Sequence, residues 1–352
     1  MFGNLFGKNL RVMTFGESHG QALGVTVDGL PAGLPLSLEL IQKDMDRRRP
    51  GTSPFVSPRK EPDRVEILSG VASDLTTNGA PICLLIRNTQ ARSQDYDGLR
   101  DKFRPGHADW TYFQKYGIPP QSGGGRASGR ETAARVAAGA LARAFLATRG
   151  VTARAALRAV GTVWAVQTDF ESAENDPLRF LDPLLSPSAQ AEVTRAKEAG
   201  DSVGGVVELS APGLPPGWGA PVFGKIEALL GGAFFSIGAV RAVEFGEGLS
   251  LASKLGSEAN DPLGPQGPLT NAHGGVLGGL STGLPLVARL FVRPTPSVSL
   301  PQETVNSRGE KVSLRIEGRH DPCLAPRAAP VAEAMALLVL ADLALEPPGK
   351  MG

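Results

Sequence analysis

The sequence predicts an α+β fold in which antiparallel sheets sandwich a layer of helices, and three observations lead to this expectation. Short apolar segments typical of strands alternate with polar turns. Longer segments carry apolar residues at helical spacing or are rich in alanine. The order of these segments in the first half of the chain recurs in the second half. Two similar halves would each bring one sheet to a shared layer of helices.

Apolar segments bounded by turns predict the strands of the first half. They cover residues 10–15, 23–29, 65–71 and 82–86. Two helices are expected beside them. Ser37 is suited to cap the first helix, which runs to about Arg49 with apolar residues at helical spacing. The second helix, at about 131–148, carries little charge and many alanines, so we expect it to be buried and closely packed.

The second half is expected to repeat this order. Three pairs of segments carry the similarity: 24–31 with 205–215, 78–89 with 282–295, and 125–126 with 318–319. Helices are expected after the second members, at about 222–236 and 328–345. Turns rich in glycine and proline also recur by accident, so duplication and chance both remain open. Without an evident linker, we expect one domain over 1–352, with related halves at about 1–150 and 151–352 if the duplication holds.

Composition excludes several classes of protein. The formal net charge is +1, so the overall field gives no reason to expect a nucleic acid partner, and any anion site must come from local clustering of basic residues. Cys83 and Cys323 are too few for a disulfide framework, which favours a reducing cytoplasm. We expect no signal peptide and no membrane helix, because no segment approaches about 20 apolar residues.

A glycine-rich segment at 123–130 is the strongest local signal of a site. Glycines expose backbone N–H groups, and the start of the following helix offers a partial positive charge, which together favour phosphate. Arg126, Ser128 and Arg130 would add side-chain donors. The alternative is a mobile surface loop before an ordinary helix. A second glycine run, at 274–279, would either let a planar ligand approach the backbone or form a tight turn.

Three consecutive arginines, Arg47, Arg48 and Arg49, end the first expected helix. Cations at this end match the helix dipole, so one interpretation is a solvated helix terminus. The other is an anion clamp, because guanidinium forks bind phosphate and carboxylate oxygens in a bidentate way. The sequence slightly favours the clamp.

The chain has four histidines, so each is a candidate for proton transfer near neutral pH. His19 and His107 lie in tight loops, where a solvated surface role is the alternative. Asp321, between His320 and a proline, would be either a turn residue or cap, or a carboxylate held ionised towards a ligand. Neither a His-Glu-x-x-His nor a Cys-x-x-Cys spacing occurs, so no metal site is expected.

Five motifs in this order resemble those of the chorismate synthase family. They are 15–20 (FGESHG), 46–51 (DRRRPG), 104–109 (RPGHAD), 124–132 (GGRASGRET) and 318–323 (GRHDPC). Together they span nearly the whole chain. The resemblance implies elimination of phosphate from 5-enolpyruvylshikimate 3-phosphate to give chorismate. It also implies reduced FMN as cofactor, an external source of that flavin, a sheet–helix–sheet sandwich and a homotetramer.

The resemblance also implies roles for individual residues. His19 would be the acid near the leaving phosphate, His107 would protonate or steady the flavin, and Asp321 would assist removal of the C6 proton. Substrate or nucleotide contacts, NADP included, would fall on Arg48, Arg49 and Arg130. The implied flavin site comprises Arg126, Ala127, Ser128, Gly238, Ala239, Gly278, Arg293, Pro294, Thr295, Pro296, Ser297 and Arg319.

The sequence departs from the family pattern at four positions: Pro54, Ala127, Gly238 and Arg293. The last three concern flavin affinity, and the first weakens a nucleotide contact. Two other interpretations stay open. One is a binding protein that has lost catalysis, against which the intact trio of catalytic candidates argues. The other is an NADPH-using flavin reductase, although bifunctional family members of that kind carry extra sequence.

Overall fold

Two five-stranded antiparallel sheets and a group of helices form the computed structural model, which describes residues 3–57, 61–89, 101–119, 122–316 and 320–346. The first sheet has the order β1 (Leu5–Phe6), β2 (Arg11–Gly16), β3 (Ala22–Asp28), β5 (Ile82–Arg87) and β4 (Val65–Ser69). The second has the order β7 (Val163–Trp164), β6 (Arg154–Val160), β8 (Gly205–Ala211), β14 (Leu286–Val292) and β9 (Val240–Phe245). The predicted mixed α+β class with antiparallel sheets is therefore confirmed.

Eight α-helices occur in the described part of the chain. They are α1 (Leu38–Arg48), α2 (Asp109–Tyr116), α3 (Thr132–Ala147), α4 (Phe170–Asn175), α5 (Ser186–Glu198), α6 (Ile226–Phe235), α7 (Gly256–Ala259) and α8 (Ala325–Ala344). Short hairpins pair β10 (Leu263–Gly264) with β11 (Gly267–Pro268), β12 (Val276–Leu277) with β13 (Leu280–Ser281), and β15 (Gln302–Val305) with β16 (Lys311–Leu314). None of the described helices is long and apolar enough to cross a membrane.

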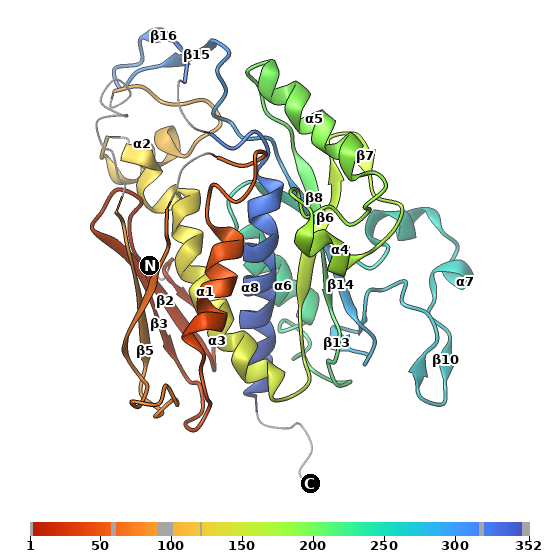
Figure 1. Ribbon diagram of the computed structural model, residues 1–352. Coiled ribbons are helices and arrows are strands. Elements are labelled where there is room, and N and C mark those ends of the chain that lie inside the picture. Colours follow the sequence, from red (N-terminus) through yellow and green to blue (C-terminus); the bar gives the residue numbers. More distant parts are fainter. Residues whose placement is uncertain (1–2, 58–60, 90–100, 120–121, 317–319, 347–352) are drawn as a thin grey trace.

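Helices α3 and α8 join the two sheets. α3 packs against β3 and β5, α8 packs against β6 and β8, and the two helices pack against each other (Figure 1). Their approach is close because small residues face one another: a Cβ added to Gly139 would lie 2.5 Å from the Ala334 Cβ. Buried apolar residues from both sheets and these helices form one cluster. The pocket described below therefore rests on a rigid base.

Several predicted boundaries need correction. The strand expected at 65–71 ends at Ser69, where the pairing register shifts and Gly70 takes a positive φ of 86°. The helix expected at 222–236 begins at Ile226. The C-terminal helix begins at Ala325, three residues before the predicted start, because Pro326 is compatible with the first turn of a helix. As predicted, Ser37 caps α1, since its hydroxyl accepts a hydrogen bond from Leu40 N–H.

Candidate active site

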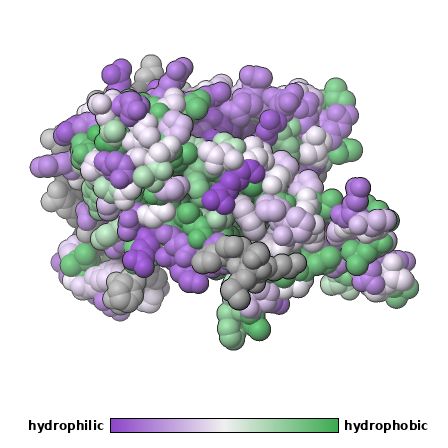
Figure 2. Space-filling view, turned by 90° about the horizontal axis from the view of Figure 1, so that it is seen from below, coloured by the Kyte–Doolittle hydropathy of each residue, from purple (hydrophilic) through white to green (hydrophobic). Residues whose placement is uncertain are grey.

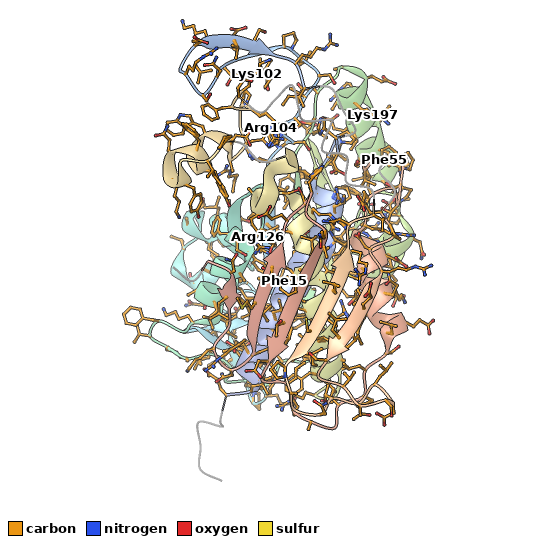
Figure 3. The ribbon with its side chains drawn as sticks, turned by 90° about the vertical axis from the view of Figure 1, so that its left-hand side faces the viewer. Phe15, Phe55, Lys102, Arg104, Arg126 and Lys197 are labelled. Carbon is orange, nitrogen blue, oxygen red and sulfur yellow. The ribbon has the colours of Figure 1, made fainter. Side chains whose placement is uncertain are left out.

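A pocket of about 800 Å³ brings together most of the residues selected from the sequence. Its walls come from the N-terminal segment, the glycine-rich loop, the end of α1, the segment before α2, the α6–β9 connection, the loop after β14 and α8 as far as Leu338. Arg126 lies at the end of the first sheet near Phe15, and Arg104 lies above it (Figure 3). Anionic groups entering the pocket would meet basic side chains from several elements.

Thirteen of the predicted site residues line this pocket. They are Arg48, His107, Arg126, Ala127, Ser128, Arg130, Gly238, Ala239, Arg293, Thr295, Pro296, Ser297 and Asp321. Four others, His19, Arg49, Gly278 and Pro294, are not part of the lining. Arg319 lies outside the described residues. Three further arginines, Arg104, Arg135 and Arg327, line the pocket without having been among the predicted site residues.

The glycine-rich loop has a conformation that only glycine adopts easily. Gly123, Gly124 and Gly125 have φ angles of 64°, 85° and 51°. Arg126 then fixes the loop to β2, because its guanidinium donates to the Gly16 carbonyl at 3.1 Å and to the Thr14 hydroxyl at 2.7 Å. The loop is therefore anchored at its end, which does not fit the alternative of a mobile surface loop.

His19 lies directly behind this loop. A Cβ on Gly123 would come within 2.2 Å of the imidazole Cε1, so only a glycine leaves room for the ring. The His19 Nδ1 is 2.9 Å from the Ser18 hydroxyl, which also donates to the Gly123 carbonyl at 3.3 Å. The histidine is thus held against a residue that lines the pocket, although it does not line the pocket itself.

The three consecutive arginines at the C-terminal end of α1 have different surroundings. Arg48 is only 1 % exposed, and it donates to Asp63 at 2.8 Å and to the Gly129 carbonyl at 3.2 Å. Arg47 instead forms a bidentate pair with the buried Glu333 of α8, at 2.7 and 3.1 Å. The interpretation of a solvated helix end is therefore wrong for Arg48. Its burial and the nearby Arg327 lower the pKa of Arg48, which stays charged at neutral pH.

Arg49 and Gly278 lie away from the pocket. Arg49 is half-buried and its Nε is 3.5 Å from Asp46 on the same helix, so the predicted clamp does not include it. Gly278 belongs to the turn of the β12–β13 hairpin, where its φ is 61°. The second glycine run forms a tight turn, and the approach of a planar ligand to it stays a prediction.

Asp321 is buried and held on both sides. One carboxylate oxygen accepts from Ser57 N–H at 2.8 Å and the other from Arg327 at 2.7 Å. The Thr295 hydroxyl donates to its backbone carbonyl at 2.7 Å. Its side chain does not cap α8, whose N-cap is Leu324 without a side-chain bond. Of the two interpretations from sequence, a carboxylate held and oriented at the pocket fits these contacts better than a helix cap.

His107 is an uncharged histidine at neutral pH. Its Nε2 is 2.8 Å from the Ser297 hydroxyl. Burial, followed by the nearby Arg104 guanidinium, lowers the pKa of His107 to about 4. Arg104 itself forms a bidentate pair with Asp109, at 2.7 and 2.8 Å, which fixes the cation beside the imidazole. An anionic ligand beside the imidazole would raise this pKa, so that the uncharged ring could then accept a proton.

The lowered pKa of His107 predicts how stability depends on pH. The folded chain resists protonation of this group. Its contribution to the free energy of unfolding is therefore fully present above the ordinary histidine pKa of about 6.5, and it is lost as the pH drops towards 4. Between pH 7.5 and pH 5.0 we expect the free energy of unfolding to fall by about 1–2 kcal/mol less in His107→Asn than in the wild type. Urea unfolding at pH 7.5 and 5.0 measures the difference. Equal acid sensitivity of both proteins would contradict the prediction.

The fold and this pocket define an enzyme-like site for anionic ligands, built on a mixed α+β scaffold. Comparison with known proteins makes the assignment specific. The family model described as chorismate synthase matches residues 10–345, and the chain belongs to the chorismate synthase family of shikimate-pathway lyases.

Individual relatives agree with this assignment over nearly their whole length. The chain is 54% identical to the chorismate synthase of Syntrophobacter fumaroxidans over 347 residues, which is 99% of this chain and 98% of the relative. It is 48% identical to that of Wolinella succinogenes over 342 residues, covering 97% and 95% of the two chains. A crystal structure of chorismate synthase superposes with a TM-score of 0.75 at 30% identity, covering 96% of this chain and 92% of the other.

Proposed function

We propose that this enzyme converts 5-enolpyruvylshikimate 3-phosphate into chorismate by 1,4-anti elimination of phosphate, with reduced FMN as a cofactor that is not consumed. The observation that carries the proposal is the arginine-lined pocket in a chain that is nearly neutral overall. The substrate carries a phosphate and two carboxylates, so it needs such a cluster of cations. Arg48 and Arg130 are proposed as its contacts, whereas the contact predicted for Arg49 gains no support from its position.

The pocket suits a flavin because it combines an apolar wall with polar groups. Val331, Met335 and Leu338 of α8 line one side. Within the described residues, the buried Arg293 Nε has no hydrogen-bond partner, and it would gain one from a flavin oxygen. Gly238 has open space where a Cβ would be, which lets a planar ring approach the backbone.

The residues proposed to hold the flavin are those implied by the family motifs. They are Arg126, Ala127, Ser128, Gly238, Ala239, Arg293, Pro294, Thr295, Pro296, Ser297 and Arg319. The flavin contact predicted for Gly278 stays a prediction, because this residue does not line the pocket of its own chain. When bound, the reduced flavin supplies transient electron donation, while the protein orients the reacting groups and excludes water.

Three side chains are proposed to move protons. His19 would act as the acid for the departing phosphate, from its place behind Gly123. His107 is uncharged at neutral pH, which suits a group that accepts and returns a proton at the flavin. Asp321 would receive the C6 proton, because it lines the pocket and hydrogen bonds from Ser57 N–H and Arg327 fix the orientation of its carboxylate.

We further propose a single domain with a sheet–helix–sheet sandwich that arose by duplication. Its support is the matching strand order: β2, β3, β5 and β4 in one sheet occupy the same relative places as β6, β8, β14 and β9 in the other. α3 follows β5 and α8 follows β14, as a repeated unit requires. The single hydrophobic cluster supports one domain.

We also propose that the enzyme is a homotetramer, that it is located in the cytoplasm, and that another system supplies its reduced flavin. An arm around α7, β10 and β11 projects from the body (Figure 1), and apolar residues gather there (Figure 2). Leu255, Leu263 and Leu269 on this arm are each about 70 % exposed, which favours burial against other copies of the chain.

An anaerobic assay tests the proposed reaction. We expect chorismate to form when substrate is mixed with enzyme and chemically reduced FMN, and not with oxidised FMN. The absorbance of the flavin should show it still reduced after many turnovers. Oxidation of one flavin for each chorismate formed would contradict the proposal, because the elimination involves no net redox change.

A further inference from the structure

Asp63 is a fully buried carboxylate in contact with two arginines of the pocket. It lies two residues before the start of β4 and is 0 % exposed. Its φ of 44° is in the left-handed region, which is uncommon for residues other than glycine and least unfavourable for aspartate and asparagine. Backbone strain of this kind persists only where surrounding contacts enforce it, and it is concentrated at functional sites.

The Asp63 carboxylate joins two arginines of the pocket. One oxygen accepts from Arg48 Nη1 at 2.8 Å, and the other accepts from Arg130 Nη1. The backbone is fixed as well, since the Gln42 side chain on α1 donates to the Asp63 carbonyl at 3.3 Å and accepts from Val65 N–H at 3.3 Å. A single residue therefore connects the end of α1 to the glycine-rich loop.

The remaining contacts leave both guanidinium groups with unused donors. Arg48 donates from Nε to Thr132 and from Nη2 to Gly129, in addition to its bond with Asp63. A guanidinium has five N–H groups, so two of those on Arg48 make no hydrogen bond to the residues that the structure describes. Arg130 has a buried Nη2 without a hydrogen-bond partner in the described part of the chain, although the Glu61 carboxylate lies 3.7 Å from it. Both arginines line the pocket.

Two cations this close repel each other. Burial lowers the pKa of Arg48 most, and the positive charges of Arg327 and Arg130 lower it further, whereas the Asp63 carboxylate raises it. The shared carboxylate offsets this repulsion and fixes the distance between the guanidinium groups.

We propose that Asp63 is a positioning residue of the substrate site, which holds Arg48 and Arg130 side by side as a double fork for one anionic group of the substrate. The inference rests on the proposed function for the identity of that substrate. Asp63 itself acts through the two arginines, because it does not line the pocket.

The variant Asp63→Asn separates positioning from charge balance. Asparagine tolerates the left-handed backbone, so the change chiefly removes the negative charge. If Asp63 only balanced charge, the pocket would become more positive and would bind the anionic substrate more tightly. If Asp63 positions the arginines, substrate affinity should fall by about 10- to 100-fold although the pocket is more positive, while kcat at saturating substrate changes much less.

A second variant tests the same point without altering charge. Gln42→Ala removes the contact that fixes the Asp63 backbone and leaves its carboxylate in place. We expect it to weaken substrate binding in the same direction, by a smaller factor. The matched control is Glu66→Gln, which removes the carboxylate of an exposed ion pair with Arg87 on the same sheet and should leave the affinity unchanged.

Substrate dissociation constants measured by calorimetry, together with kcat in the anaerobic assay, give the result. Weaker binding by Asp63→Asn and Gln42→Ala, but not Glu66→Gln, supports the inference. Tighter or unchanged binding in Asp63→Asn overturns it, and if that variant fails to fold, unchanged binding in Gln42→Ala does so. A wild-type chain that forms no chorismate would instead refute the proposed function, so the two failures are distinguishable.

Discussion

Replacing Asp321 by asparagine should lower turnover by roughly 10²–10⁴, the usual contribution of a positioned acid–base group. Asparagine keeps the size and one acceptor, so it can still take the hydrogen bond from Ser57 N–H, which is 2.8 Å long in the wild type. It cannot accept the C6 proton. Affinity for substrate and flavin should therefore stay near the wild-type value, and a loss confined to kcat marks an interaction made in the transition state.

The matched control for this variant is Asp44→Asn. Asp44 is also buried and also paired with an arginine, since Arg143 Nε donates to it at 2.8 Å, but it does not line the pocket. Both variants break a buried ion pair, and thermal unfolding measures that common cost. Only Asp321→Asn should lose turnover. Near-normal turnover of this variant at saturating reduced flavin would remove Asp321 from the mechanism.

Local sequence predicted the elements whose pattern is local. The Ser37 cap and helical spacing predicted α1, and the alanine-rich segment predicted α3 to within a residue at each end. The strand β6 (Arg154–Val160) was missed, because its alanines and arginines have low strand propensity. This segment is a strand because it pairs with β7 and β8 in the second sheet, and the local sequence does not indicate that pairing.

The contacts of the site depend on parts of the chain that are far apart in sequence. Glycine runs and histidines in tight loops were visible as candidates. The partners of the arginines were not: Arg47 pairs with Glu333, 286 residues away, while the adjacent Arg48 turns to Asp63. Successive side chains on a helix point about 100° apart, so three consecutive arginines cannot share one site. Which one enters the pocket follows from the packing of α1 against α3 and α8.

Replacing Gly123 by alanine should also lower turnover by roughly 10²–10⁴, although it changes no titratable group. The new Cβ would come within 2.2 Å of His19 Cε1 and 2.3 Å of its Nδ1, so the imidazole must move. Its φ of 64° adds a backbone cost of about 1–2 kcal/mol for an alanine. If His19 is the acid proposed above, a displaced imidazole could no longer protonate the leaving phosphate, and the loss should match that of His19→Ala.

The appropriate control is Gly231→Ala in α6, because a Cβ added there meets no atom within 4 Å and helix propensity favours alanine. Turnover and thermal unfolding of both variants, measured with saturating reduced FMN, separate a local effect from a global one. The double variant Gly123→Ala with His19→Ala should be no slower than either single variant, because both remove the same proton donor. Wild-type turnover in Gly123→Ala would show that the acid is not a histidine held at this place.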